Sequence, residues 1–306
     1  MGHRIVKFSV AIAVAVVMLG AFAPSMYITS DGNILDVFII DGQSNAAYSN
    51  VDGSVDLNLV NAELKAPSHD LYYYGTVHRP AMNHDTDVNY GIHRIYDGSY
   101  KVGGLVAPFA YYLSELQGRD ILVLDVGISA QSIANLVPGS SGGDWKMAII
   151  ADALNEVSGY EKINMLGWTW LQGESDTTMP VDDYIAYFKE LQKYYSSIGA
   201  KECFIVKTRA QYGGNATLAQ DYLIDHDPFV VLGTDVTETF TGTPYMLDNL
   251  HYSQAARIII SDKVAEVIPI DHFGDFDTAN MYLAAIPTLI ILSLILSAAI
   301  LVKNRY

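Results

Sequence analysis

The sequence predicts an α/β domain, a parallel sheet in a three-layer α/β/α arrangement, flanked by N- and C-terminal transmembrane helices. Three observations lead to this prediction. Short, almost wholly apolar runs alternate with helical patterns, both chain ends are long and uncharged, and every acidic residue lies between them. A sheet covered by helices on both faces needs such apolar strands, and alternation with helices favours parallel pairing.

The N-terminal segment, residues 1–26, is predicted to be a signal anchor or a signal peptide. Arg4 and Lys7 precede an uncharged run that ends in the motif AFA at residues 21–23. A basic start, an apolar middle and an A-x-A ending are typical of a cleaved signal peptide. The same run, with its flanking residues, is also long enough to span a bilayer, so both alternatives stay open.

The C-terminal segment, residues 279–306, is predicted to be a transmembrane anchor. The run from Met281 to Val302 carries no charge, and Lys303 and Arg305 follow it. A helix rises about 1.5 Å per residue, so this run is long enough to cross an apolar layer of about 30 Å. A buried core helix is the alternative. The positive-inside rule places the basic ends in the cytoplasm and the central domain on the extracytoplasmic side of the cell membrane.

The central segment carries all the acidic residues of the chain. The 306 residues have a net charge of −16, although half of them are hydrophobic. All 34 acidic residues lie between Asp31 and Asp277, where only 14 of the 18 basic residues lie, so this segment has a charge of −20. Such acidity excludes a nucleic acid partner and favours a well-solvated external domain. The single cysteine, Cys203, excludes an internal disulfide and is interpreted as buried filler.

The domain itself is predicted to span residues 27–278 and to begin with a strand. Each predicted strand is a short apolar run rich in β-branched or aromatic residues. In chain order these runs are Asn33–Asp41, Asp120–Val126, Asn164–Leu171, Glu202–Thr208 and Pro228–Leu232.

Helices are predicted between these strands wherever apolar residues recur at every third or fourth position. The first of them has Pro108 in its first turn, and the third follows Pro180, and both are positions at which proline favours a helix start. The predicted helices are Leu105–Gln117, Trp145–Val157, Val181–Ser197 and Ser253–Ile268.

Residues 48–103 fit this alternation poorly, because they are rich in Asp, Asn, Gly, His and Tyr. We interpret them as a long, irregular excursion over the active edge of the sheet, since long loops are uncommon unless they line a site. His78, His84 and His93 match no tight ligand spacing and are interpreted as loop histidines rather than a metal site. Tyr72–Tyr74 are candidates for stacking on sugar rings or for plain packing.

Ser44 follows the first predicted strand in the motif GQSN at residues 42–45. A serine that follows a strand and a glycine lies at the first turn of a helix. Its hydroxyl is exposed there, and backbone N–H groups face an oxyanion. A helix-capping serine without chemistry is the alternative.

Asp248 precedes His251 by three residues, just before the last predicted helix. A carboxylate at this spacing fixes the tautomer of the ring. If the fold brings the two ends together, His251 takes the proton of Ser44, which gives a nucleophile, a base and an orienting acid. A capping aspartate and a surface histidine are the alternative.

Two more turns follow the middle strands. The third strand leads into Gln172, Gly173 and Glu174, where the Gln172 amide is a candidate oxyanion donor and Gly173 permits a tight turn. Glu174 and Asp176 are candidates for orienting loops or binding a metal. The second strand leads into a turn of small residues, 127–132, whose N–H groups complete the oxyanion hole.

These blocks, in this order, resemble those of SGNH hydrolases, and more narrowly the sialate O-acetylesterase-like carbohydrate acetylesterases. The resemblance rests on GQSN at residues 42–45, WxQGExD at 170–176 and DxxH at 248–251, and it extends from about Leu35 to Val267. It implies a flavodoxin-like α/β/α fold and ester hydrolysis, typically removal of acetyl groups from sugars, with no cofactor and no metal.

The resemblance also implies roles for single residues. Ser44 matches the nucleophile, His251 the general base and Asp248 its partner. The implied oxyanion hole consists of the Ser44 N–H, an N–H of Ser129 or Ala130, and the Gln172 amide; the family's usual Gly-Gly pair is replaced here by Ser129-Ala130. The supporting motif residues are Gly42, Gln43, Asn45, Gly173 and Glu174.

The sequence therefore predicts a membrane-anchored, extracytoplasmic serine esterase that removes O-acetyl groups from a carbohydrate or glycoconjugate. Both termini are expected to contact the lipid bilayer. The alternative is a catalytically weak or inactive glycan-binding or cell-envelope protein with the same fold, which the Ser129-Ala130 departure favours and an intact Ser44, Asp248 and His251 disfavour. An esterase acting on lipids is a third hypothesis, disfavoured because the sequence has no long apolar lid segment.

Overall fold

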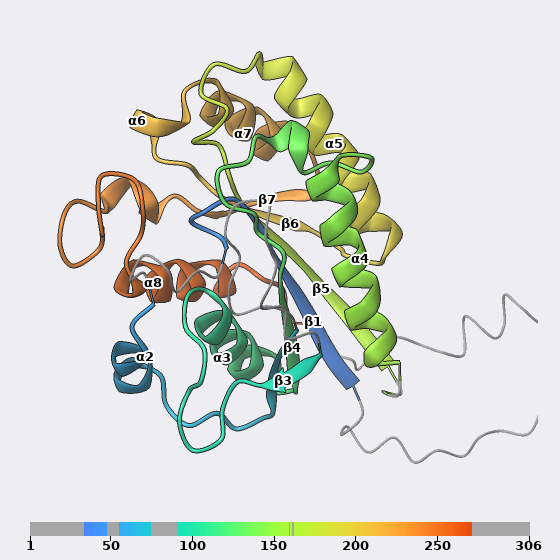
Figure 1. The fold of residues 1–306 in the computed structure, drawn as a ribbon, viewed down its shortest axis with the longest axis vertical. Helices are drawn as coiled ribbons and strands as arrows, with labels where there is room; N and C mark the ends of the chain where they lie inside the picture. Colours follow the sequence, from blue (N-terminus) through green and yellow to red (C-terminus); the bar gives the residue numbers. More distant parts are fainter. Residues whose placement is uncertain (1–33, 48–54, 75–90, 159, 161, 271–306) are drawn as a thin grey trace, which may run out of the picture. The chain divides into compact units, whose positions relative to one another are not determined.

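The computed structural model describes residues 34–47, 55–74, 91–158, 160 and 162–270 (Figure 1). Within these residues no helix is both long enough and apolar enough to cross a membrane. The two predicted membrane segments, 1–26 and 279–306, lie outside the described residues and stay predictions. The same holds for His78 and His84 of the predicted loop histidines.

The described residues form a mixed α/β fold around a seven-stranded sheet. In chain order its strands are β1 (Ile34–Gly42), β2 (Leu71–Tyr74), β3 (Ile92–Arg94), β4 (Ile121–Asp125), β5 (Lys162–Leu171), β6 (Cys203–Val206) and β7 (Val230–Thr234). Their spatial order is β3-β2-β4-β1-β5-β6-β7. Every neighbouring pair is parallel except β2 and β3, so the predicted parallel sheet is confirmed apart from one edge strand.

The prediction of an irregular excursion over residues 48–103 is wrong for the described part of this stretch. It contains helix α2 (Leu57–Glu63) and the strands β2 and β3. The alternation was hard to detect because β2 is only four residues long and lies between polar residues. Tyr72–Tyr74 make up most of that strand, in which Tyr74 is buried and Tyr73 packs against His93 of β3, with ring centroids 5.4 Å apart. Tyr74 therefore has a packing role, and Tyr72 and Tyr73 are half-buried on the same strand.

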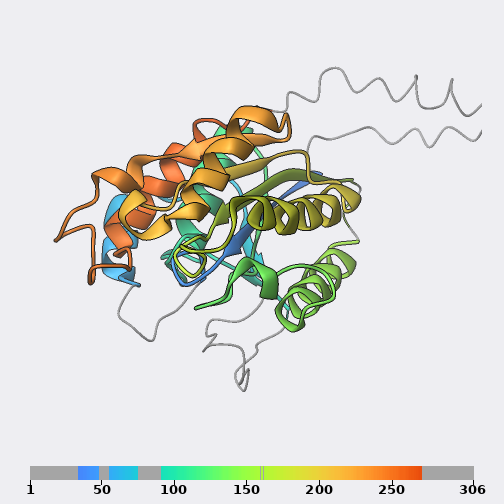
Figure 2. The same cartoon turned by 90° about the horizontal axis from the view of Figure 1, so that it is seen from above.

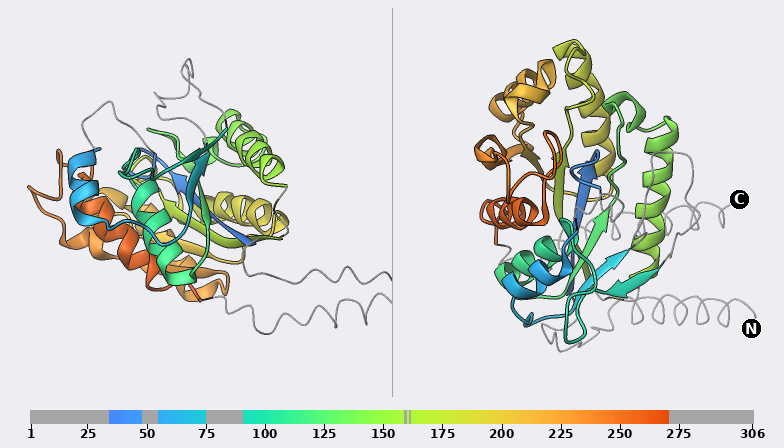
Figure 3. Two further views of the ribbon diagram at one scale, coloured as in Figure 1. Left: turned by 90° about the horizontal axis from the view of Figure 1, so that it is seen from below. Right: turned by 60° about the vertical axis from the view of Figure 1, so that its left-hand side comes forward.

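Helices cover both faces of the sheet (Figures 1 and 2). On one side α3 (Val106–Gln117) packs against α8 (Gln254–Ala265) and β4. On the other side α4 (Ser141–Glu156), α5 (Val181–Ser197) and α7 (Asn215–His226) contribute to one buried cluster with residues of β1, β4 and β5. Figure 3 shows α3 and α4 on opposite sides of the strands.

The predicted helices occur with small differences in their bounds. The helix predicted at Val181–Ser197 has those bounds, whereas α4 begins four residues before Trp145 because Ser140 caps it and accepts a hydrogen bond from Gly143 N at 3.0 Å. Helix α7 was not predicted, since its apolar residues do not all lie on one face: Leu218 and Tyr222 are exposed, whereas Thr217 and Gln220 are buried. Its buried residues are Ala216, Thr217, Ala219, Gln220 and Leu223.

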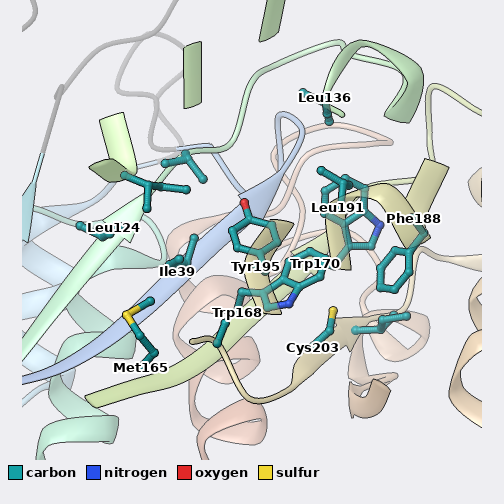
Figure 4. Close-up of a cluster of buried hydrophobic side chains, with 14 of the residues drawn as sticks. Ile39, Leu124, Leu136, Met165, Trp168, Trp170, Phe188, Leu191, Tyr195 and Cys203 are labelled. Atoms are coloured by element: carbon teal, nitrogen blue, oxygen red, sulfur yellow. The ribbon is translucent and has the colours of Figure 1, made fainter. Parts of the chain in front are cut away.

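A buried cluster under α5 packs against the end of β5, which leads into the WxQGExD motif at residues 170–176 (Figure 4). The indole of Trp168 stacks on Tyr195 with ring centroids 4.2 Å apart and on Phe188 at 5.4 Å. Trp170 lies on the same face, two residues further along the strand, and its Nε1 donates to Tyr184 Oη at 2.9 Å. Replacing either tryptophan by alanine would cost about 3–5 kcal/mol. Cys203 is buried in this cluster, as expected of filler, and burial raises the pKa of its thiol.

Candidate active site

The carboxyl ends of three adjacent strands meet at one edge of the sheet. In the order β4-β1-β5, the serine turn after β1 lies between the turns after β4 and β5. Backbone hydrogen bonds join them: Gln43 N donates to Leu171 O, and Ile128 N donates to Gly42 O, each at 3.0 Å. Chemistry in parallel sheets collects at this edge, and all the predicted site residues before Asp248 lie there.

The serine turn depends on Gly42. This residue has a φ of 145°, and a Cβ atom on it would lie 2.0 Å from Leu171 O, so any side chain would collide with the neighbouring strand. After it, the N–H groups of Ala46 and Ala47 both donate to the Gln43 carbonyl, at 2.9 and 2.8 Å. A capping Ser44 would bind those same two N–H groups, so the turn leaves its side chain without a capping role. Ser44 is half-buried.

Asp248 and His251 form the predicted pair. Asp248 Oδ2 lies 2.8 Å from His251 Nδ1, and Asp248 Oδ1 accepts hydrogen bonds from the backbone N–H groups of Leu250 and His251, both at 2.6 Å. Partial burial raises the pKa of Asp248, but these hydrogen bonds lower it by more, so the pKa falls below its usual value to about 2. The carboxylate is therefore ionised at neutral pH and directs the Nδ1 proton toward itself, which leaves Nε2 as the basic nitrogen.

Asn45 brings the serine turn and the histidine loop together. This side chain is fully buried; its Oδ1 accepts from Tyr252 N at 3.0 Å, and its Nδ2 donates to Leu250 O at 3.2 Å. The residue after Ser44 thus binds the backbone on both sides of His251. Within the described residues no hydrogen bond joins the Ser44 and His251 side chains themselves, and such bonds often tighten only when substrate is bound.

The turn after β5 is held against the serine turn by two side chains. Glu174 Oε1 accepts the second hydrogen of Asn45 Nδ2 at 2.8 Å, and Gln43 Oε1 accepts from Ser175 N at 3.3 Å. Gly173 has a φ of 156° and makes way for Thr208, whose Oγ1 would lie 2.5 Å from a Cβ at that position. Gln43, Asn45 and Glu174 therefore join the two turns, and Gly173 allows Thr208 to approach closely.

The Gln172 amide is engaged within a buried network. Its Nε2 donates to Gln131 O at 3.1 Å and to Asp176 Oδ2, and its Oε1 accepts from Tyr184 Oη at 2.9 Å. Both amide hydrogens are thus used, and donation to an oxyanion requires one of these bonds to break. The predicted oxyanion role of Gln172 stays a prediction; the structure shows it as the link between the turns after β4 and β5.

Asp176 belongs to the same network and orients a loop. Its Oδ2 accepts from Ile133 N at 2.8 Å and its Oδ1 from Ser132 Oγ at 2.5 Å, which fixes the start of the short helix η2 (Ile133–Asn135). Among the described residues no group of three or more His, Cys, Asp or Glu side chains is arranged to hold a metal ion. Of the two open alternatives for Asp176, the contacts favour loop orientation.

The turn after β4 contains a left-handed alanine in place of a glycine. Ala130 has a φ of 57°, and in the part of the chain that the structure describes no other non-glycine residue has a positive φ. A left-handed conformation costs alanine about 1–2 kcal/mol, and such strain tends to be kept at functional sites. Among the described residues, no acceptor binds the backbone N–H group of Ser44 or that of Ala130. Both N–H groups are therefore available to bind an oxyanion.

The sequence did not predict a buried ion pair behind the serine turn. Asp41 accepts from Lys146 Nζ at 2.6 Å, from Tyr195 Oη at 2.7 Å and, through Oδ1, from Gly42 N at 2.8 Å. Lys146 gives no local signal of burial, because a lysine is almost never fully buried unless it is paired. The buried face of α4 includes Lys146, Ile149, Ile150 and Ala153.

A polar cavity of about 460 Å³ lies at the opposite edge of the sheet, near the residues that precede β2 and β4. Its lining includes Asp70, Arg94 and Asp120. Arg94 already binds Asp70 through both guanidinium nitrogens, at 2.8 and 2.7 Å, and Asp120 Oδ1 accepts from Asp70 N at 2.9 Å. These groups satisfy one another, so we place the candidate site at the edge that carries Ser44 and not in this cavity.

Comparison with solved structures finds similar folds at low sequence identity. A protein from Arabidopsis thaliana is 17% identical, with 76% of this chain and 96% of that chain covered and a TM-score of 0.52. NanS is 16% identical, with coverage of 78% and 97% and a TM-score of 0.49. A carbohydrate acetylesterase from Xanthomonas citri is 14% identical, with coverage of 75% and 54% and a TM-score of 0.47.

The likeness to the Arabidopsis protein supports the fold, and at these identities none of the three structures carries a function to this chain. No protein-family model matches the sequence, and no curated protein matches it.

Proposed function

We propose that this protein is a serine esterase in which Ser44 is the nucleophile, His251 the general base and Asp248 its orienting acid. The observation that carries the proposal is the Asn45 side chain, which binds the backbone on both sides of His251 from the position next to Ser44. Residues separated by more than 200 positions in the sequence are thereby held in one site. The ionised Asp248 supports it, because a base of this kind needs its tautomer fixed.

In the proposed reaction Ser44 Oγ attacks the ester carbonyl while His251 Nε2 accepts the hydroxyl proton. The oxyanion is bound by the backbone N–H groups of Ser44 and of Ser129 or Ala130, with the Gln172 amide as the third donor if it leaves its present partners. His251 then protonates the departing alcohol, which leaves an acyl-serine. Water, deprotonated by the same ring, attacks the acyl carbon and releases the acid and the free serine.

We further propose an acetylated carbohydrate or glycoconjugate as the substrate. The order of the GQSN, WxQGExD and DxxH motifs supports this choice, and so does the charge of −20 between the two ends, because a neutral acetyl ester is not repelled by an acidic domain. The apolar ends support a location at the cell membrane, with the domain on the extracytoplasmic side.

The test uses covalent labelling and product release together. Wild type should react with a serine-directed fluorophosphonate and release acetate from acetylated monosaccharides, and Ser44→Ala should do neither. The control variant is Ser158→Ala, which removes an exposed hydroxyl at the end of α4 and should behave as wild type. If Ser44→Ala and wild type label and hydrolyse alike, the esterase proposal is wrong. Binding of the acetylated sugar without acetate release would instead support the glycan-binding alternative.

Membrane location needs a separate test. Single cysteines placed near each terminus, in a chain in which Cys203 has been replaced, should be protected from a membrane-impermeant thiol reagent in intact cells. A cysteine at an exposed position of the central domain, such as Ser158, should be labelled. Labelling of both termini from outside would overturn the proposed orientation.

A further inference from the structure

Exposed apolar side chains gather on helix α7 and in the turn that follows it. Leu218 and Tyr222 lie four positions apart on one face of the helix, with 58% and 49% of their surface exposed. The ring of Tyr222 stacks on His226, with centroids 4.3 Å apart, so this face continues to the end of the helix. Phe229, in the turn before β7, is 53% exposed. A solvent-facing helix surface is normally polar, so Leu218, Tyr222 and Phe229, the apolar patch, are a candidate contact surface.

The apolar patch reaches the edge of the sheet opposite the candidate site. Phe229 directly precedes β7, and its carbonyl accepts from Cys203 N, at the start of β6, at 2.8 Å. The starts of parallel strands lie at one edge of a sheet, whereas Ser44 follows the other end of β1. That strand has nine residues, which separates Ser44 from the start of β1 by about 30 Å.

Lysines accompany the apolar patch at this edge. Lys193 lies near the end of α5 and Lys201 between α5 and β6, and both are exposed. Lys189 of α5 binds the carboxylate of Asp227, in the turn before β7, which compensates that negative charge. Asp225 is an exposed acid of the same surface. Exposed aromatic rings together with lysines are typical of protein surfaces that lie at a membrane–water interface, and here they occur in a segment whose overall charge is −20.

The course of the chain indicates which partner covers this edge. Strand β1 begins here at Ile34, ten residues after the uncharged run that ends at Ala23, and ten residues span at most about 35 Å. Helix α8 begins beside the histidine loop and packs along β6 and β7, so it runs back toward the same edge. Fifteen residues separate its end from the uncharged run that starts at Met281. Both runs that we propose to lie in the membrane are therefore tethered to the edge that carries Phe229.

We propose that this edge of the domain docks on the surface of a lipid bilayer, with Phe229 and Tyr222 in the interface and Lys193 and Lys201 at the headgroups. The inference rests on the membrane location proposed above. An interfacial contact enters a bilayer by only about 5–10 Å, so Ser44 is held on the side of the domain that faces away from the lipid. The site then takes acetylated glycans that extend away from the membrane, and not a short glycolipid of the same bilayer.

The test places a fluorescent probe at each edge of the full chain in vesicles of phosphatidylcholine and phosphatidylglycerol. In a Cys203→Ala background, the dye NBD is attached to Pro228→Cys, next to Phe229, or to Thr178→Cys, in the turn after β5. Both positions are exposed. Nitroxide-labelled lipids should quench most of the fluorescence at position 228 and none of it at position 178.

Variants of the apolar patch show which side chains make the contact. In the chain labelled at position 228, Phe229→Ser combined with Tyr222→Ser should remove most of the quenching. Leu247→Ser is the matched control, because it removes an exposed leucine from the edge that carries the candidate site, and it should leave the quenching unchanged. The double variant should release acetate from a soluble acetylated sugar at the wild-type rate. An acetylated glycolipid with a single sugar, placed in the same vesicles, should not be hydrolysed by wild type.

The outcomes separate this inference from the proposals on which it rests. Equal quenching at the two positions, weaker quenching at position 228, or hydrolysis of the short glycolipid would overturn the docking proposal while the chain still floats with the vesicles. Self-association in detergent that Phe229→Ser abolishes would also overturn it, because a second copy would then cover the apolar patch. A chain that does not float with vesicles at all refutes the membrane location and the docking together. Unchanged quenching without any Ser44-dependent hydrolysis refutes only the esterase proposal.

Discussion

Lys146 and Asp41 form an ion pair from which solvent is fully excluded, with Nζ 2.6 Å from Oδ2. Asp41 lies three residues before Ser44, and the Lys146 ammonium group also faces the rings of Trp170 and Tyr195, at 5.7 and 5.9 Å from their centroids. Burial lowers the pKa of Lys146, and Asp41 opposes that effect. The strand end that carries the proposed nucleophile is thus anchored to two helices by charge as well as by packing.

We expect Lys146→Met to destabilise the fold by about 3–5 kcal/mol, because it leaves the Asp41 carboxylate buried and uncompensated. Adding Asp41→Asn to this variant should restore most of the loss, since a neutral amide needs no counter-charge. Urea unfolding of the three proteins measures this. Lys193→Met, an exposed lysine of α5, is the control and should stay within about 0.5 kcal/mol of wild type. Equal loss in the single and double variants would contradict the charge argument.

We expect the stability of the fold to depend on both the size and the charge of the side chain at position 45. Asn45→Ala removes three hydrogen bonds of a fully buried side chain and leaves Tyr252 N and Leu250 O without this partner, at a cost of about 2–4 kcal/mol. Asn45→Asp keeps the size but replaces the donor to Glu174 by a second carboxylate, so it should destabilise at least as much at neutral pH and less at acid pH. Thermal unfolding at both pH values distinguishes them. Wild-type hydrolysis by either variant would refute the joining role of Asn45.

The positions of Ser44, Asp248 and His251 could be predicted because each lies next to an element with a strong local signal. Strand β1 is mostly apolar, with Asp36 as the one charged residue before Asp41, and the DxxH motif precedes a helix with regular apolar spacing. What could not be predicted are contacts between distant segments. The engagement of Gln172 with Asp176 and Tyr184 depends on how the turn after β4 meets the start of α5, and no local pattern encodes that meeting.

The edge strands β2 and β3 were not predicted, for a related reason. Strands β2 and β3 have four and three residues, and their stability comes from pairing with β4 and with each other rather than from their own sequence. The burial of Lys146 on α4 could not be predicted either, because a lysine is almost never fully buried unless it is paired, and its partner Asp41 lies 105 positions away in the sequence.

Acid should weaken the histidine loop in a manner that depends on Asp248. Its pKa is lowered from 3.8 to about 2 in the folded protein, so the stabilisation is present above pH 4 and is lost as pH falls from about 4 to 2. Asp248→Asn should remove this part of the pH dependence while keeping an oxygen that accepts from His251 N. Melting temperatures measured from pH 6 to pH 2 test the sign. A steeper loss in Asp248→Asn than in wild type would contradict the assignment.

Ala130 should tolerate glycine better than any larger residue. Its φ of 57° costs alanine about 1–2 kcal/mol, and glycine removes this strain but adds about 0.5–1 kcal/mol of unfolded-chain entropy. Ala130→Gly is therefore expected to be neutral to slightly stabilising and to retain hydrolysis. Ala130→Val should destabilise more strongly, because a β-branched residue disfavours this conformation further. Unfolding free energies of the three proteins rank them, and a loss in Ala130→Gly would show that the alanine methyl makes a contact of its own.

Gly42→Ala provides a sharper test of the serine turn when it is compared with a second glycine. Gly42 and Gly98 both have positive φ, 145° and 95°, but only Gly42 is crowded. A Cβ at Gly42 would meet Leu171 O at 2.0 Å, whereas a Cβ at Gly98 meets nothing within 4 Å. Gly98→Ala should therefore cost only the backbone strain, about 1–2 kcal/mol, and keep full activity. Gly42→Ala should push β1 from β5 and abolish Ser44 labelling by a fluorophosphonate; equal behaviour of the two variants would show that strand contact does not position Ser44.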